Sequence, residues 1–183
     1  WDRNQGSTSW FGWTGPSVDH TLGTSLGWYV FVDGGNGNFL HNAILRSNYL
    51  PDTSAVCELH FWYHMKGSSV GTLYVYVDSH DGAQPAQMWS KTGNQGSQWQ
   101  EGVVKLGKRT FPYTVLFEVM ADTSFGSAYS DDIAIDDISF INCDPNRLPL
   151  DCDMESGFCS WTQAKDDQFD WSRGKYGTPS QGT

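Results

Sequence analysis

Basic residues are scarce in this 183-residue chain, in which 11 Lys and Arg stand against 21 Asp and Glu and the formal net charge is −10. A chain this acidic repels phosphate backbones, which argues against nucleic acid as a partner. The same charge attracts divalent cations, although acidity can also serve only to keep a protein soluble. The charge balance therefore makes nucleic acid a poor partner and divalent cations a plausible one.

Long apolar runs and helix-favouring runs are also lacking. No stretch is long enough to span a bilayer, and no signal peptide is recognisable, so the sequence predicts no membrane insertion of this segment. Gly is abundant, with 20 residues, and aromatic residues make up 15% of the chain. This composition predicts an all-β fold with many turns and a substantial core.

Cysteine is limited to four residues, and no Cys-x-x-Cys pair is present, which argues against a zinc or thioredoxin-type site. Four cysteines allow three connectivities. A local pair closes a loop cheaply, so the favoured pairing is Cys152 with Cys159 and Cys57 with Cys143. Disulfides indicate an oxidising compartment, and we therefore expect a mature or excised piece of an extracellular protein, secreted or at the cell surface.

Short β-rich runs separated by turn residues predict the strands. They fall at residues 28–32, 43–45, 56–65, 71–78, 88–91, 99–106, 113–120 and 131–141. The runs 56–65 and 71–78 flank Gly67-Ser68-Ser69 and are predicted to pair as an antiparallel hairpin. The whole set predicts a jelly-roll-like antiparallel β-sandwich.

The composition changes after Cys143, where residues 144–151 are polar, contain proline and are predicted to be a linker. Near the C-terminus, Trp171-Ser172-Arg173 echoes Trp1-Asp2-Arg3, and both are followed by a stretch rich in Gly, Ser and Thr. The two ends therefore look like the same segment of two successive repeats.

Motifs along nearly the whole chain resemble those of one family. They are Cys152-Asp153-Met154-Glu155, Phe158-Cys159-Ser160-Trp161, Phe169-Asp170-Trp171-Ser172-Arg173, Gly15-Pro16-Ser17-Val18-Asp19-His20-Thr21, Cys57 to Met65, Trp89 to Gly96, Phe117-Glu118 and Ile133 to Ile138. Together they resemble the MAM domain, named after meprin, A5 and receptor phosphatase mu. The order differs from the family, because the opening segment stands at the C-terminal end.

The resemblance implies a division of the chain. Residues 1–143 would be a MAM body that lacks its first strand, and residues 152–183 would be the opening segment of a following or complementing domain. That segment can complete its own body in a permuted fold, follow as the next unit of an array, or complete a neighbour's body by strand donation. The sequence leaves these three arrangements open.

Paired aspartates interrupt the predicted strand Asp131–Ile141. Strict alternation places Ile133, Ile135 and Asp137 on one face and Ala134, Asp136 and Ile138 on the other. One carboxylate then points to the core, which is costly unless it is paired or bound to a metal. One alternative is a β-bulge in which one Asp faces solvent while the other bonds to backbone N–H groups, Arg3 or Arg173.

The other alternative is a structural calcium ion, since hard cations prefer oxygen ligands. The resemblance implies such an ion, which would clamp the opening strand to the last one. Carried over by motif, the candidate ligands are Asp137, Asp136, Glu155, Asp170 and Asp19.

Three further features have weaker functional interpretations. Gly23 to Gly27 matches Gly-x-Ser-x-Gly, but a strand-like run follows where a nucleophile elbow needs a helix. His60 and His64 share a strand face and are predicted to be packed or edge histidines. An aromatic loop containing Trp10, Phe11 and Trp13 is either an exposed interaction patch or a cap on the sandwich.

No catalytic constellation is apparent, so we expect no enzyme. The resemblance implies an extracellular adhesion or assembly module, and the repeat-like ends favour a tandem or polymeric array whose partners are copies or neighbouring MAM units. The alternative is a carbohydrate-binding module, because a sandwich with exposed aromatic residues suits a glycan.

Overall fold

The computed structural model describes residues 14–33, 42–110, 112–120, 132–143, 151–167 and 170–174. These ranges contain ten strands and no helix, so they also contain no helix able to cross a membrane. The strands are β1 (Tyr29–Asp33), β2 (Asn42–Ser47), β3 (Glu58–Lys66), β4 (Thr72–Asp78), β5 (Ala86–Thr92), β6 (Gln100–Lys105), β7 (Thr114–Met120), β8 (Asp132–Ile141), β9 (Trp161–Gln163) and β10 (Ser172–Gly174).

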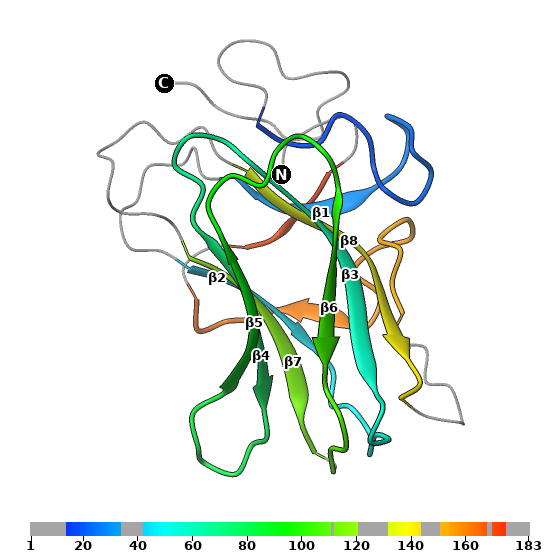
Figure 1. Cartoon of the computed structure of the whole chain (residues 1–183), viewed down its shortest axis with the longest axis vertical. Helices are drawn as coiled ribbons and strands as arrows, with labels where there is room; N and C mark the ends of the chain where they lie inside the picture. Colours follow the sequence, from blue (N-terminus) through cyan, green and yellow to red (C-terminus); the bar gives the residue numbers. More distant parts are fainter. Residues whose placement is uncertain are drawn as a thin grey trace.

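The strands form two five-stranded sheets that pack face to face (Figure 1). The first sheet has the order β10-β1-β8-β3-β6, and the second has the order β5-β4-β7-β2-β9. Every neighbouring pair is antiparallel. The predicted jelly-roll-like antiparallel β-sandwich is confirmed.

The main core lies between the sheets because the strands alternate in sequence. In β4, Leu73, Val75 and Val77 point inward and are fully buried, while the residues between them are partly exposed. Phe61 of β3 and Phe117 of β7 meet across the core with ring centroids 4.8 Å apart. Each such side chain contributes about 1.5–3 kcal/mol through burial.

The predicted hairpin of residues 56–65 and 71–78 is wrong. The corresponding strands, β3 and β4, belong to different sheets. Each brings a row of apolar side chains to the same core from opposite sides, so the connection around Gly67 arches between the layers. A short turn rich in Gly and Ser is compatible with either geometry, and burial of both apolar rows decides between them.

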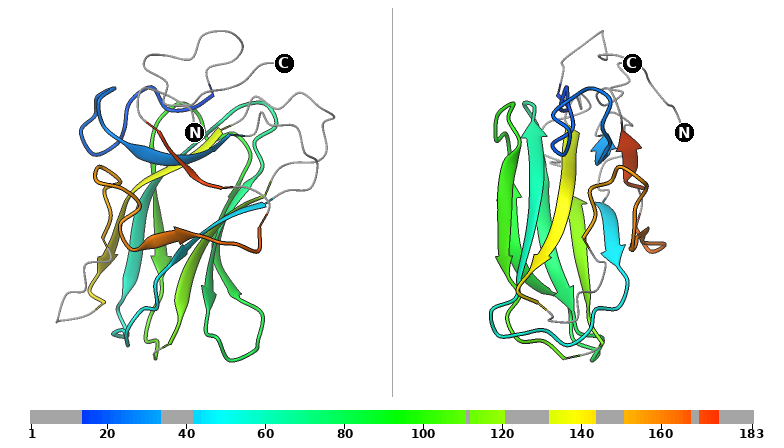
Figure 2. Two further views of the ribbon diagram at one scale, coloured as in Figure 1. Left: turned by 180° about the vertical axis from the view of Figure 1, so that it is seen from behind. Right: turned by 90° about the vertical axis from the view of Figure 1, so that its right-hand side faces the viewer.

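The C-terminal segment, defined here as the described residues of 151–174, pairs with the body of its own chain. β10 pairs with β1 at the edge of the first sheet, and β9 pairs with β2 at the edge of the second. Figure 2 shows both contacts, with β10 in red beside β1 in blue and β9 in orange beside β2 in cyan. The segment also supplies Met154, Trp161 and Trp171 to the main core.

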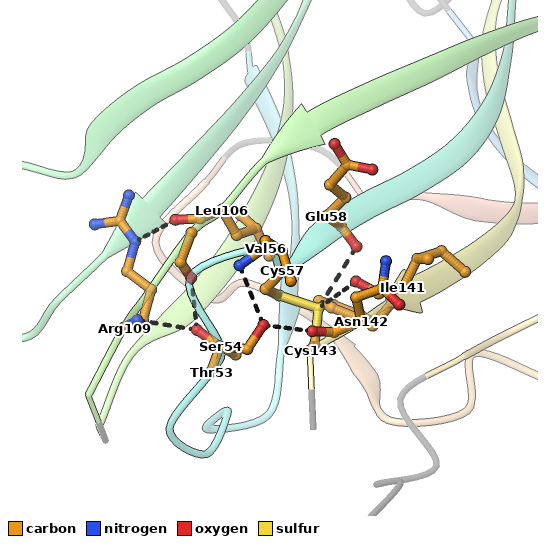
Figure 3. Close-up of a disulfide and its surroundings, with 12 residues drawn as sticks. Thr53, Ser54, Val56, Cys57, Glu58, Leu106, Arg109, Ile141, Asn142 and Cys143 are labelled. Carbon is orange, nitrogen blue, oxygen red and sulfur yellow. Dashed lines mark hydrogen bonds between the residues drawn. A yellow bond between two sulfur atoms is a disulfide. The ribbon is translucent and has the colours of Figure 1, made fainter. Parts of the chain in front are cut away.

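Both predicted disulfides are confirmed. Cys57 and Cys143 join the start of β3 to the end of β8, and Cys152 and Cys159 close a local loop in the C-terminal segment. Around the first bond, Ser54 Oγ donates to the Asn142 carbonyl at 2.5 Å (Figure 3). The disulfide and this hydrogen bond together hold the start of β3 against the end of β8.

Candidate functional site

A β-bulge explains the paired aspartates of β8. The register of β3 against β8 runs from Trp62 opposite Asp136 to His60 opposite Ser139, so β8 contains one extra residue there. Asp137 adopts a positive φ of 48°, a conformation that Asp tolerates better than most residues.

The bulge shifts the alternation, and the predicted faces beyond it were wrong. Ile133, Ile135 and Ile138 all join the main core, whereas Asp137 does not. Strict alternation would have placed Ile138 on the face of Asp136. Because β8 contains this extra residue, neither Asp136 nor Asp137 points into the main core.

The outer face of the first sheet is covered by the cover loop, defined here as residues 14–28. Asp132 and Asp136 point to this outer face yet are fully buried. Tyr29, Phe31 and Ala134 form a second, small apolar cluster beneath the loop, with Trp99 packed against it.

Two hydrogen bonds from aromatic side chains hold the cover loop down. The Trp99 Nε1–H donates to the Val18 carbonyl at 2.9 Å, and the Tyr29 hydroxyl donates to the Pro16 carbonyl at 3.3 Å. The two rings also meet edge to face, with centroids 5.8 Å apart. Burial of both rings therefore depends on the position of the loop.

Asp136 is held by backbone donors. Its Oδ2 accepts the His20 N–H and its Oδ1 accepts the Asp137 N–H, each at 2.9 Å. Burial raises the pKa of Asp136 to about 8, the backbone donors counteract this, and the charge of Asp137 adds to the rise. This arrangement matches the bulge alternative, in which backbone N–H groups bind one Asp.

Asp137 binds the tip of the cover loop. Its Oδ2 lies 2.5 Å from His20 Nδ1, and its Oδ1 accepts the Thr21 hydroxyl at 2.7 Å. The His20 ring stacks on Trp62, with centroids 3.7 Å apart and planes 16° from parallel. The bulge thus presents one carboxylate under the loop and one at its rim.

The remaining predicted acidic residues occupy different surroundings. Asp19 is buried and accepts the N–H groups of Leu22 at 2.5 Å and Thr24 at 3.0 Å. Glu155 accepts the Trp28 N–H at 2.5 Å and so joins the C-terminal segment to the end of the cover loop.

Asp170 is exposed and lies two residues before β10. Its charge acts on Asp167, whose pKa is raised first by burial and further by Asp170 and Asp166. Asp167 in turn accepts the Ile44 N–H of β2 at 2.5 Å.

The donor chemistry of these acids suits calcium, because all of their ligand atoms are oxygens. Their arrangement does not form a ready-made cage, since the part of the chain that the structure describes contains no group of three His, Cys, Asp or Glu side chains suited to a metal ion. Asp19, Asp136 and Asp137 instead direct their carboxylates at donors of the cover loop. Calcium binding stays a prediction.

Arg173 of β10 ties the C-terminal segment together. Its guanidinium donates to the carbonyls of Met154 and Glu155 and lies over the Trp28 ring, 3.8 Å from the centroid. The predicted alternative paired Arg173 with an aspartate, whereas these two hydrogen bonds go to backbone carbonyls. Arg3, the other candidate in that alternative, lies outside the described residues.

No local sequence pattern indicates the aromatic cover over the bulge. His20, Trp62 and Trp99 are far apart in the chain and meet only because the cover loop folds over the first sheet. His64 also packs against Trp99, and burial lowers its pKa to about 4. The predicted aromatic loop with Trp10, Phe11 and Trp13 lies outside the described residues.

Comparisons with known proteins agree with these motifs. The family model described as "MAM domain, meprin/A5/mu" matches residues 1–144. Neuropilin-1a of Danio rerio is 33% identical over 142 residues, and MAM domain-containing protein 2 of Homo sapiens is 31% identical over 140 residues. These alignments cover 75% and 76% of this chain but only 15% and 19% of the relatives.

A solved chain described as "CBM4 structure and function" aligns with a TM-score of 0.37 and 11% identity, over 64% of this chain and 95% of its own length. That likeness is too weak to support an argument about function. The family model covers most of the chain, including the cover loop, the Cys57–Cys143 disulfide and the bulge of β8. This chain belongs to the MAM domain family.

Proposed function

We propose that this chain is a non-catalytic extracellular assembly module whose C-terminal segment completes the sandwich of a neighbouring copy. MAM domains are protein-interaction modules of extracellular proteins, and the chain matches that family. Its two disulfides suit an oxidising compartment. The partner in this proposal is a second copy or a neighbouring MAM unit.

The observation that carries the proposal is that one segment closes both sheets on the same side of the sandwich. β10 covers the edge of β1, and β9 covers the edge of β2. Without the segment, both edges would present unpaired backbone groups, which invite pairing with another chain. The core would also lose Met154, Trp161 and Trp171.

The contacts that hold the segment are the same whichever copy supplies it. They consist of strand pairing, buried apolar side chains such as Trp161 and Trp171, and hydrogen bonds such as that from the Trp28 N–H to Glu155. Residues 144–150 connect the segment to the body after Cys143. Exchange of such an element between copies is a low-cost route to an oligomer, because it creates few new contacts.

Cysteine trapping distinguishes exchange from closure within one chain. Arg46 of β2 lies directly opposite Thr162 of β9, and Thr162 is exposed. One sample carries Arg46→Cys and another carries Thr162→Cys, and the two are mixed and oxidised. Exchange gives a disulfide-linked dimer of the two variants on a non-reducing gel.

The matched control replaces Arg46→Cys by Thr72→Cys. Thr72 of β4 pairs with β5 and β7 and not with β9, so this mixture should give no linked dimer. If the first mixture also stays monomeric, while a chain carrying both Arg46→Cys and Thr162→Cys closes internally, exchange is wrong. The module then binds some other molecule through a different surface.

Calcium forms a second part of the proposal, as a structural ion near the bulge. The support for this part is that three acidic residues from different elements all contact residues 20–28. They are Asp19 of the cover loop, Asp137 of β8 and Glu155 of the C-terminal segment. A bound ion would stabilise the junction of these elements. Thermal unfolding should shift upward with Ca²⁺ and back with chelator, and Asp137→Asn should reduce the shift.

Sedimentation equilibrium in Ca²⁺ and then in chelator links the two parts. Loss of oligomers on chelation would make the acidic residues a clamp for exchange. Oligomers that persist in chelator would separate assembly from the ion. The absence of any thermal shift with Ca²⁺ would contradict the calcium part alone.

A further inference from the structure

Two tyrosines lie side by side on the outer face of the second sheet. Tyr74 and Tyr76 are two residues apart in β4, so both point away from the core, and both are partly exposed. Their ring centroids are 5.6 Å apart, and the ring planes are tilted by 31°. The two rings therefore form one continuous aromatic surface rather than two separate contacts.

Polar groups border this surface along β5 and β7. Tyr74 lies opposite Ser90 on one side and Glu118 on the other, while Tyr76 lies opposite Gln87 and buried Leu116. Figure 1 shows β5, β4 and β7 side by side in this order.

The polar groups are held in place by bonds to one another. The Asn42 Nδ2–H donates to Glu118 Oε1 at 2.5 Å, and the Gln87 Nε2–H donates to Ser90 Oγ at 3.5 Å. Glu118 and Tyr74 are both close enough to Tyr76 to add, after burial, to the rise in its phenol pKa. A fixed carboxylate, amides and a hydroxyl thus surround the two rings.

We propose that Tyr74 and Tyr76 form a binding platform for a neutral oligosaccharide. The C–H faces of a pyranose ring pack on an aromatic face, and its hydroxyls exchange hydrogen bonds with carboxylates, amides and hydroxyls. Two adjacent rings suit two adjacent sugar units. The platform uses only β4 and its neighbours, so it does not depend on exchange of the C-terminal segment.

Charge selects a neutral glycan over an anionic one. Glu118 lies opposite Tyr74, and the chain carries a net charge of −10. Lys91 of β5 lies opposite inward-pointing Leu73 and so outside the row of the two tyrosines. Arg46 of β2 lies opposite Leu116, and its Nη2 is 3.6 Å from the Asp166 carboxylate. Sulfated or uronate-bearing sugars would therefore be repelled.

The test is calorimetric or NMR titration of the whole chain with cellohexaose, laminarihexaose, mannohexaose and chitohexaose, with a heparin hexasaccharide as the anionic probe. At least one neutral sugar should bind, and heparin should not. Tyr74→Ala and Tyr76→Ala should each weaken binding by about tenfold or more, because each removes one stacking face.

Conservative and remote variants sharpen the test. Tyr74→Phe and Tyr76→Phe keep the ring face and should retain most of the affinity. Tyr49→Ala is the matched control, because Tyr49 is 61% exposed but packs beside His80, beyond the end of β4. Unchanged thermal midpoints of all the variants would show that folding is not the cause of a loss.

The proposal is overturned if none of the four neutral sugars binds. It is also overturned if heparin binds more tightly than they do, or if binding survives the double variant Tyr74→Ala/Tyr76→Ala. None of these outcomes bears on the cysteine-trapping result, so the two proposals fail separately.

Discussion

The two outer faces of the sandwich follow the same strand alternation but reach opposite environments. On the first sheet, Tyr29, Asp132 and Asp136 point outward and are nevertheless fully buried under the cover loop. On the second sheet, Tyr74 and Tyr76 point outward and stay partly exposed. The alternation of residues along a strand determines which face of the sheet a side chain occupies. The presence or absence of a covering segment, here the cover loop, determines whether that face is buried.

The largest expected effect tests whether the cover loop makes a second core. Tyr29→Ala should lower the free energy of unfolding by about 3 kcal/mol or more, because it empties a buried aromatic position. Tyr76→Ala on the open face should cost less than about 1 kcal/mol. Urea unfolding followed by fluorescence measures both, and equal losses would show that the two faces do not differ energetically.

The pH dependence of stability tests the burial of Asp136. Its pKa is about 8 in the folded chain against 3.8 as the ordinary value, so the folded chain keeps a proton that the unfolded chain releases between these pH values. The stabilising contribution is fully present below about pH 4 and is lost as the pH rises through about 8. One proton limits the slope to about 1.4 kcal/mol per pH unit.

Thermal unfolding from pH 7 to pH 9, in chelator, measures this slope, and Asp136→Asn should flatten it. This range lies above the one in which His64, whose pKa is lowered to about 4, acts in the opposite direction. His60 contributes in the same direction as Asp136, because Glu101 and Glu58 raise its pKa despite the opposing effect of burial. A second series in His60→Ala therefore separates the two groups. A stability that rises with pH across this range would contradict the assignment to Asp136.

A smaller effect is expected at the bond that holds the loop. Trp99→Phe keeps the aromatic packing but removes the Nε1–H that donates to the Val18 carbonyl. It should cost about 1–2 kcal/mol, since a partly buried acceptor loses its donor. It should also increase hydrogen exchange in residues 19–27 but not in β4, and equal protection in both regions would argue against local opening.

The smallest effect is expected on the open face. Arg46 and Asp166 lie 3.6 Å apart, and the Asp166 side chain is 71% exposed. A double-mutant cycle with Arg46→Ala and Asp166→Ala should give a coupling energy below about 1 kcal/mol, because solvent screens the pair. A larger coupling would mean that the second sheet is also shielded at this edge.

Much of the fold was predictable because local patterns carry it. The strand runs, the sandwich class and both disulfide pairings follow from alternation, turn residues and the short spacing of Cys152 and Cys159. It was harder to predict from the sequence to which of the two sheets a strand belongs. Residues 56–65 and 71–78 look like a hairpin because a short Gly-Ser connection can either join two paired strands or lead from one sheet to the other. Its sequence does not distinguish these two geometries.

The candidate site was harder to predict because its parts are set by tertiary contacts. The bulge at Asp137 changes the phase of β8 by one residue, and only pairing with β3 reveals that shift. The cover loop has no period that marks it as buried, so the stacking of His20 on Trp62 has no local signal. The motif resemblance located Asp19 and Asp136, but it did not indicate which donors they bind.

The Cys57–Cys143 disulfide has a mechanical consequence. Tension that reaches Cys143 passes directly to Cys57, bypassing the 86 residues of sequence separation between them. Those residues hold strands β3 to β8, and they would otherwise add about 300 Å of length if pulled out straight. Under load, the C-terminal segment would separate from β1 and β2, while the part of the chain between Cys57 and Cys143 kept its length. The module would therefore extend by a short first step and then resist further extension.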